Sequence, residues 1–149
     1  MAYEFKLNRR VEFSDTDMAG IMHYSNFFHF MEATEAAFFR SLGFSIVPSA
    51  TTKDKVGWPR VHVDCDFKHP LRFEDMVEIQ MLVREKKERA LVYTFIFRKL
   101  NATPVQEVAR GNIVAACVRH NPETGKMEAT PIPVTITDRI ELAPKELFD

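Results

Sequence analysis

The sequence predicts a single α+β domain over residues 1–149, in which a curved, mainly antiparallel sheet of five strands wraps around one long central helix. Two observations favour this class. Apolar and polar residues alternate in several separate segments, which is typical of strands with one buried face. One other segment carries its apolar residues at helical spacing and is apolar on most sides, which indicates a buried helix. The length suits one domain with a substantial core.

The predicted strands follow one another along the chain. Residues 3–13 alternate between polar and apolar, and this period of two returns at 61–67, 77–83 and 91–97. A fifth segment, 105–120, is more continuously apolar, as in a strand covered on both faces. The connections EKKERA and NATP have the length of hairpin loops, so these last four strands should pair mainly as an antiparallel meander.

The helix is predicted from about Ser25 to Leu42, between the first and second strands. Ser25 or Asn26 is a candidate N-cap, and Gly43 suits the C-terminal cap. After Pro131 the pattern is ambiguous, with a short surface helix as one interpretation of residues 134–142. The apolar stripe of the main helix comprises Phe27, Phe30, Met31, Thr34 and Phe38.

Composition narrows the classes of function. The formal net charge is -1, so no global field favours nucleic acid as a partner. Cys65 and Cys117 lie far apart without CxxC spacing, which argues against a zinc site or a disulfide framework. The N-terminal segment has no apolar signal-peptide core, and no apolar run approaches the roughly 20 residues of a membrane span. We therefore expect a cytoplasmic protein with no membrane partner.

A sheet wrapped around one helix leaves an open edge and an incompletely covered helix. Pairing with a second copy would cover both, so we expect at least a homodimer. The sequence leaves open whether dimers associate further into a tetramer.

The loop before the helix combines acidic residues with a permissive glycine. Asp15, Asp17 and Gly20 precede the helix entrance at residues 23–26, where unpaired backbone N–H groups and the positive end of the helix dipole collect. A carboxylate beside such amides is a workable hydrolytic site, because the amides can stabilise an oxyanion while the carboxylate attacks or activates water. The alternative is that both aspartates are ordinary turn residues without chemistry.

The segment VEFSDTDMAGIMHYSNFFHFMEATEAAFF resembles the signature of the hotdog-fold acyl-CoA thioesterases of the 4-hydroxybenzoyl-CoA thioesterase type. The resemblance continues through VGWPRVHVDCDFKHPLRFEDMVEIQ and covers roughly residues 3–120. It implies a hotdog fold and hydrolysis of acyl-CoA to the free acid and CoA, with no cofactor and no metal. The acyl group, the choice between CoA and an acyl carrier protein, and the choice between a nucleophilic and a general-base aspartate stay open.

Carried over by position, the resemblance implies that Asp17 is the catalytic carboxylate and that the backbone amide of Tyr24 polarises the thioester carbonyl. Asp15 would then organise the loop. Implied substrate-binding residues are Gly20, Ile21 and His23 of the loop and, at the dimer interface, Trp58, Pro59 and Arg60 of the partner.

The resemblance also places Lys87 and Arg89, in the hairpin between the third and fourth strands, on the phosphates of CoA. Flexible or forked cationic donors suit phosphate. The competing interpretation is an ordinary solvated hairpin tip, because Glu85 and Glu88 dilute its charge.

Three other readings of the same residues remain. His29, Glu32 and Glu35 are spaced three apart on the helix, either as a metal-binding face or as polar residues at the rim of a buried helix, and Glu32 is the best candidate for a secondary role. A non-catalytic acyl-CoA or acyl-carrier binding module would keep the pocket without a productive carboxylate. Dehydratase chemistry would need His29 as a base, whereas the Asp-Thr-Asp loop favours hydrolysis.

Overall fold

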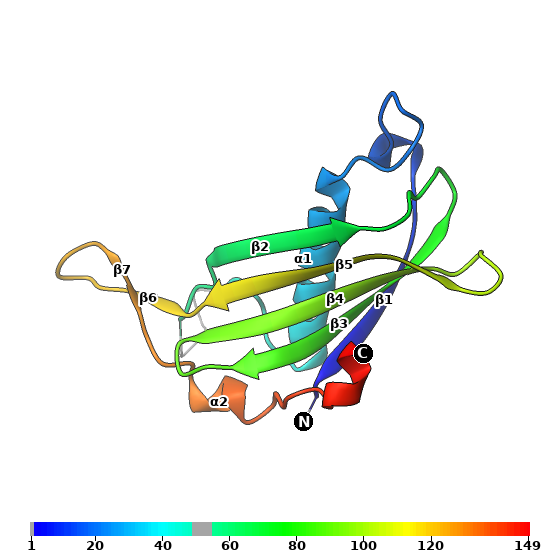
Figure 1. Ribbon diagram of the computed structural model, residues 1–149. Coiled ribbons are helices and arrows are strands. Elements are labelled where there is room, and N and C mark those ends of the chain that lie inside the picture. Colours follow the sequence, from blue (N-terminus) through cyan, green and yellow to red (C-terminus); the bar gives the residue numbers. More distant parts are fainter. Residues whose placement is uncertain (1, 49–54) are drawn as a thin grey trace.

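The computed structural model describes residues 2–48 and 55–149 of the chain. Its main sheet is antiparallel throughout, and α1 (Ser25–Ser41) packs across one face of it (Figure 1). The predicted α+β hotdog class, with five strands around a long helix, is confirmed. In spatial order the strands are β1 (Glu4–Arg10), β3 (Met76–Lys86), β4 (Ala90–Lys99), β5 (Gln106–Ala116) and β2 (Arg60–Phe67).

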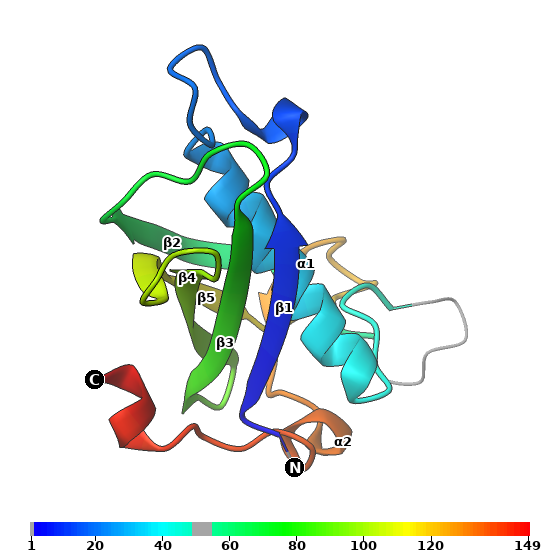
Figure 2. The ribbon, with the colours of Figure 1, turned by 90° about the vertical axis from the view of Figure 1, so that its right-hand side faces the viewer.

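Two of the sequence predictions differ from the structure at the ends of the chain. The strand predicted over 3–13 ends at Arg10, because the chain then turns into η1 (Phe13–Asp15) and leaves Phe13 76% exposed. The helix predicted over 134–142 is the single turn α2 (Val134–Thr137). Figure 2 shows η2 (Lys145–Phe148) on the face of the sheet opposite α1. The hairpin of β6 (Val118–His120) and β7 (Met127–Ala129) projects beyond the main sheet (Figure 1).

The N-terminus of α1 differs from the prediction in both its N-cap residue and its capping bonds. Tyr24 occupies the N-cap position and makes no side-chain capping bond. The imidazole Nδ1 of His23 instead accepts the Ser25 N–H at 3.2 Å and lies 2.8 Å from the Ser25 hydroxyl. Asn26 donates from Nδ2 to the Asp15 carbonyl at 2.8 Å. The prediction of Ser25 or Asn26 as N-cap was therefore wrong, because both side chains serve the loop.

The C-terminal end of α1 follows the prediction. Gly43 has φ of +86°, a conformation that glycine adopts without strain. Its N–H donates to the Arg40 carbonyl at 3.0 Å, and the Phe44 N–H donates to the Phe39 carbonyl at 2.9 Å. This pair of bonds is the Schellman motif, which satisfies carbonyls that the helix end leaves unpaired.

The helix runs antiparallel to β2 and makes three contacts with that strand and the residues just before it. Two of these contacts are aromatic pairs, and the contact between them is an ion pair. In order along α1 they are Phe27 with Phe67 (ring centroids 5.0 Å apart), Glu35 with Arg60, and Phe39 with Trp58 (5.6 Å).

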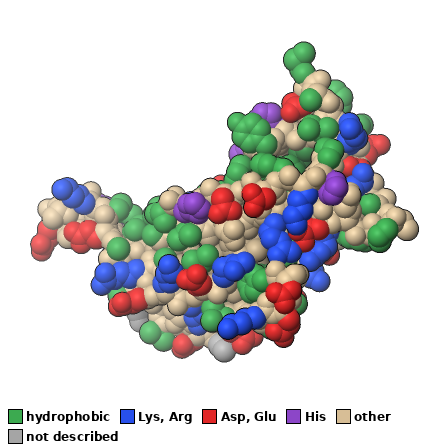
Figure 3. Space-filling model, in the orientation of Figure 1, with side chains coloured by type: hydrophobic (Ala, Val, Ile, Leu, Met, Phe, Trp, Pro, Cys, Tyr) green, Lys and Arg blue, Asp and Glu red, His purple; other side chains and the backbone are tan. Residues whose placement is uncertain are grey.

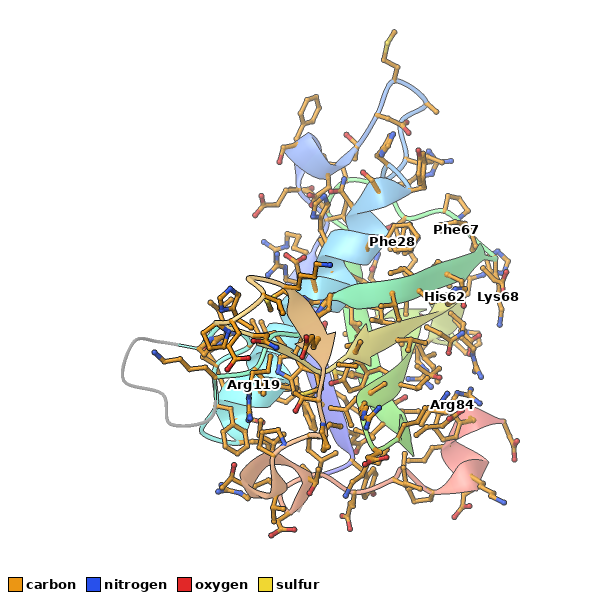
Figure 4. The ribbon with its side chains drawn as sticks, turned by 90° about the vertical axis from the view of Figure 1, so that its left-hand side faces the viewer. Phe28, His62, Phe67, Lys68, Arg84 and Arg119 are labelled. Atoms are coloured by element: carbon orange, nitrogen blue, oxygen red, sulfur yellow. The ribbon has the colours of Figure 1, made fainter. Side chains whose placement is uncertain are left out.

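A β-bulge makes the ion pair between Glu35 and Arg60 possible. Asp64 accepts from Asn112 at 3.0 Å and His62 contacts Asp64 at 2.9 Å, and Figure 4 shows His62 on the side of β2 away from α1. Strict alternation would put Arg60 on that outer side too. The register with β5 shifts between Arg60 and His62, and the Arg60 side chain reaches Glu35 on α1 instead. Re-aiming one side chain in this way is a common role of bulges at sheet edges.

The strand β2 forms one edge of the sheet and pairs only with β5 in the described chain. Its apolar side chains are incompletely covered, since Val61 is 64% exposed, Val63 40% and Phe67 50%. An uncovered, apolar edge strand is a surface that proteins normally pair or protect. Within the part of the chain that is described, no helix is both long and apolar enough to cross a membrane.

Candidate active site

A cavity of about 410 Å³ opens between the loop that precedes α1 and the end of β2. Its size falls within the range of ligand pockets. Figure 3 shows hydrophobic side chains gathered around this end of the molecule, and Figure 4 shows Phe67 at the end of β2 on the side of α1. The lining residues are Asp17, Ile21, Met22, Tyr24, Phe27, Phe67, Lys68, His69 and Pro70.

The loop holds Asp17 at the cavity by a tight turn. The Asp17 N–H donates to the Ile21 carbonyl at 3.0 Å, and the Gly20 N–H donates to the Asp17 carbonyl at 2.9 Å. Gly20 has φ of +80°, so a side chain at this position would strain the turn. The carboxylate Oδ1 accepts the Ala19 N–H at 2.8 Å. Asp17 is thus both a turn residue and a cavity residue, with one carboxylate oxygen oriented by the backbone.

Asp15 has a different position and does not line the cavity. Its Oδ2 accepts the Glu12 N–H at 2.8 Å, which closes η1. Its carbonyl accepts the His23 N–H at 2.9 Å and the Asn26 side chain at 2.8 Å. These bonds tie the start of the loop to the start of α1, which is the organising role that we expected of Asp15.

Tyr24 contributes to the cavity at the N-terminus of α1. Within residues 2–48 and 55–149, its backbone N–H has no hydrogen-bond acceptor. An unpaired amide at a helix N-terminus is suited to a developing negative charge. His23 is not among the lining residues, because its ring is bound to Ser25 and stacks on Tyr24 with centroids 4.5 Å apart. Of the predicted loop residues, Gly20 shapes the turn and Ile21 forms part of the wall.

The predicted residues at the start of β2 and just before it do not line the cavity of their own chain. Trp58 is 5% exposed and packs against Phe39 in the core. Pro59 is exposed, and Arg60 donates to the Trp58 carbonyl at 3.2 Å while it pairs with Glu35. The structure thus gives Trp58 a packing role. Contact of this segment with a substrate held by a partner stays a prediction.

The basic hairpin lies at the other end of the sheet. Lys87 and Arg89 are exposed in the turn between β3 and β4, and the Lys87 ammonium is 3.6 Å from Glu85. The opposite end of β3, at Met76, pairs with Arg10 just before the Asp-rich loop. A strand of eleven residues spans roughly 35 Å. One chain therefore does not bring this hairpin and Asp17 together.

The helix residues considered as a metal face are separated by burial. His29 and Glu32 are exposed, whereas the Glu35 side chain is fully buried, so Glu35 is not a rim residue. Within the described residues, no group of three or more His, Cys, Asp or Glu side chains is placed to hold a metal ion. The interpretation of His29, Glu32 and Glu35 as a shared metal-binding face therefore finds no support among the residues that the structure describes.

The buried Glu35 carboxyl instead pairs with the partly exposed Arg60, and its charge acts on the buried Tyr93 phenol. Burial raises the pKa of the Glu35 carboxyl, while the charge and hydrogen bond of Arg60 oppose that rise. Burial, followed by the negative charge of Glu35, raises the pKa of the Tyr93 phenol. Among the described residues, Glu35 Oε2 and the Tyr93 hydroxyl have no hydrogen-bond partner.

Sequence reasoning missed one wall of the cavity, formed by the end of β2 and the residues after it. Phe67, Lys68, His69 and Pro70 line this wall. The Lys68 ammonium forms an ion pair with Glu107, which in turn accepts from Arg110 at 2.7 Å. The available signal was the FKHP sequence, which ends the alternating segment at 61–67 with a charged residue, a histidine and a turn residue.

The chain is similar to several thioesterases in sequence and structure. It is 25% identical over 146 residues to the 4-hydroxybenzoyl-CoA thioesterase of Pseudomonas sp. strain CBS-3, which covers 95% of this chain and 99% of that protein. The solved structure of that enzyme superposes with a TM-score of 0.82 at 21% identity, over 93% of this chain and 99% of that one.

Two further relatives extend the comparison. The chain is 29% identical over 119 residues to a 1,4-dihydroxy-2-naphthoyl-CoA hydrolase of Synechococcus sp. strain CC9605, covering 77% of this chain and 74% of that protein. The structure of a gentisyl-coenzyme A thioesterase is 30% identical, with a TM-score of 0.73 over 91% of this chain and 98% of that one.

The model of the thioesterase-like superfamily matches residues 11–140, which include the Asp-rich loop, α1 and all of β2 to β5. The predicted enzyme class, a thioester hydrolase, is confirmed. With most of its length matched, the chain belongs to the thioesterase-like superfamily.

Proposed function

We propose that this protein is an acyl-CoA thioesterase in which Asp17 is the catalytic carboxylate and the Tyr24 N–H polarises the thioester carbonyl. One observation carries the proposal: Asp17 and Tyr24 line the same cavity, whose other walls are mostly apolar. The carboxylate either attacks the carbonyl carbon or removes a proton from the attacking water. The amide then hydrogen-bonds the oxyanion, which carries more charge than the ground-state carbonyl and gains more from the bond.

The turn around Asp17 supports this role. The bond from the Ala19 N–H fixes Oδ1 and so limits rotation of the carboxylate, while the second oxygen has no partner among the described residues. The free oxygen is then available to water or to the carbonyl carbon. Holding a reacting group in one orientation lowers the entropic cost of the reaction.

We further propose that the functional unit is a homodimer formed along β2. Two copies of β2 paired antiparallel would satisfy the free edge and cover Val61 and Val63. Such pairing of identical strands sets the start of one β2 beside the end of the other.

This arrangement gives the basic hairpin a route to the cavity. Ala90, next to the hairpin, pairs with Ala116 of β5, and Arg60 pairs with Ala115, so the hairpin and the start of β2 share one end of the sheet. In the proposed dimer that end lies beside the partner's Phe67 end, where the partner's cavity opens. Lys87 and Arg89 would bind CoA phosphates for the partner's site, and the segment of Trp58, Pro59 and Arg60 would lie near the acyl group.

For the acyl group we propose an aromatic acid. The cavity wall contains Phe27 and Phe67, whose rings meet edge to face at 72°. Such faces and edges stack favourably with a further ring. The named relatives act on hydroxylated aromatic acyl groups, namely 4-hydroxybenzoyl, 1,4-dihydroxy-2-naphthoyl and gentisyl. Benzoyl-CoA and its hydroxylated forms are therefore the first substrates to assay, beside short and long aliphatic acyl-CoAs.

The test is release of free thiol from these substrates by the wild-type protein and by Asp17→Asn. We expect Asp17→Asn to lower turnover at least about a hundredfold, because an amide neither attacks nor accepts a proton effectively. Asp15→Asn is the matched control. Its amide oxygen can still accept the Glu12 N–H, so activity should stay within about threefold of wild type.

Circular dichroism and the urea midpoint of each variant report whether it folds. Near-native turnover by a folded Asp17→Asn protein would rule out Asp17 as the catalytic group. Thermal stabilisation of the wild type by acyl-CoA without thiol release would show the other candidate, a non-catalytic acyl-CoA or acyl-carrier binding module.

A further inference from the structure

The cavity contains one histidine, His69, on the wall that faces the Asp-rich loop. Its backbone N–H and that of Lys68 both donate to the Val108 carbonyl, at 3.1 and 2.8 Å, which fixes the chain where β2 ends. Its imidazole is exposed and makes no hydrogen bond within residues 2–48 and 55–149. By contrast, the ring of His23 is bound to Ser25 and that of His62 to Asp64.

Thioester hydrolysis involves two proton transfers. The attacking water loses a proton, and the departing thiolate gains one. Asp17 can accept the proton from the water, and the Tyr24 N–H can stabilise the oxyanion. Neither group supplies a proton to the leaving sulfur. Asp17 and His69 line the same cavity of about 410 Å³, near the lower end of ligand-pocket volumes, so a thioester held at Asp17 lies in a space that His69 also borders.

The other proton-bearing side chains of the cavity are less suited to the sulfur. The titratable groups that line it are Asp17, Tyr24, Lys68 and His69, with Glu107 behind Lys68. The Lys68 ammonium is held by Glu107. A phenol is in general a far weaker acid than an imidazolium. Histidine is the usual general acid near neutral pH.

We infer that His69 is a catalytic residue that protonates the leaving thiolate, an inference that rests on the proposed thioesterase function. As Asp17 takes a proton from water, the water oxygen bonds to the carbonyl carbon and the oxyanion forms at the Tyr24 N–H. The oxyanion then collapses, the C–S bond breaks, and the electron pair leaves with sulfur. The imidazolium of His69 gives its proton to that sulfur, and the proton on Asp17 returns to the neutral imidazole through solvent. The balance is one thioester and one water converted into one acid and one thiol.

The experiment compares two thioesters of the same acid that differ in their need for a proton donor. Benzoyl-CoA releases an alkyl thiol, whereas S-(4-nitrophenyl) thiobenzoate releases a much more acidic aryl thiol that departs readily as the thiolate. For His69→Gln we expect kcat/KM to fall about tenfold or more with benzoyl-CoA and less than about threefold with the aryl thioester. Asp17→Asn should slow both substrates alike.

His29→Gln is the matched control, since His29 is exposed on α1 and is not a lining residue. It should leave both rates within about twofold of wild type. A His69→Gln protein that folds, as judged by circular dichroism, and that loses activity equally on both thioesters, or on neither, overturns the assignment of His69. If the wild type releases no thiol from any acyl-CoA, it is the proposed function that fails.

Discussion

Removal of Arg60 should destabilise the protein in a strongly pH-dependent way. The Glu35 side chain is fully buried and its Oε1 pairs with Arg60, whereas its Oε2 has no partner among the described residues. Arg60→Ala would leave a carboxylate in the core without a counter-charge. Breaking a buried pair from one side typically costs about 3–5 kcal/mol.

The carboxyl can escape part of that cost by keeping its proton. Burial already raises the pKa of Glu35 above its ordinary value of 4.5, and Arg60 is the first of the influences that lower it. Without Arg60 the pKa of the folded state rises further, while that of the unfolded state does not change. Below pH 4.5 both states hold the proton and the penalty is absent. Above it, only the unfolded chain releases the proton, so stability falls by up to about 1.4 kcal/mol per pH unit until the folded carboxyl also ionises.

The assay is urea unfolding of wild type, Arg60→Ala and Glu35→Gln/Arg60→Ala at pH 5 and pH 8. Protein concentration is held fixed, because association would also shift the transition. Relative to wild type, Arg60→Ala should lose about 3–5 kcal/mol at pH 8 and clearly less at pH 5. The double variant has no charge at position 35 and should recover stability at pH 8. An Arg60→Ala loss that is equal at both pH values, or a double variant no more stable than Arg60→Ala at pH 8, would refute this reasoning.

Three further predictions concern packing, thiols and assembly. A Cβ on Gly111 would lie 2.5 Å from the Asp64 carbonyl oxygen, a backbone atom that cannot rotate away, so Gly111→Ala should cost about 1–3 kcal/mol in urea unfolding, and a change below about 0.5 would contradict the clash. Burial raises the pKa of Cys65 to about 12 and that of Cys117 to about 11, so the native protein should react slowly with a thiol reagent at pH 8 and quickly once unfolded; fast native labelling would be inconsistent with this. Val63→Asp would place like charges against each other in the proposed β2 pairing and should yield monomers in sedimentation velocity, whereas an unchanged mass would exclude β2 as the interface.

Much of the fold was predictable because local patterns and the global structure agree. Period-two alternation located β2, β3 and β4, continuous apolarity located β5, and the apolar stripe located α1 to within one residue of its ends. Gly43 was predictable as a cap because a positive φ has a strong residue preference. The residues alone drew attention to the acidic loop before the helix, and only the resemblance to the thioesterases distinguished Asp17, which lines the cavity, from Asp15, which does not. The bond that Asp17 accepts from the Ala19 N–H could not be predicted.

The features that escaped prediction depend on pairing between distant residues. Alternation put Arg60 on the outer side, and only the register with β5 shows the bulge that turns it to Glu35, 25 positions away. Glu35 itself lies one turn after Met31 on the buried face, and a charge there is a signal that a counter-charge must be sought. His69 follows the last strand residue by only two positions, and no periodicity indicates which way a side chain points once a strand has ended.

The two aromatic pairs and the ion pair between α1 and the β2 segment couple the position of the helix to that of the edge strand. The N-terminus of that helix borders the cavity, and the free edge of that strand is where we place a second copy. In the proposed dimer, assembly and binding of acyl-CoA would act on the same pair of elements and would therefore be thermodynamically linked. If dimer formation raises the affinity for acyl-CoA by some factor, then bound acyl-CoA raises the affinity between subunits by the same factor. The apparent affinity for acyl-CoA would then depend on the subunit concentration, and acyl-CoA would promote formation of the dimer that binds it.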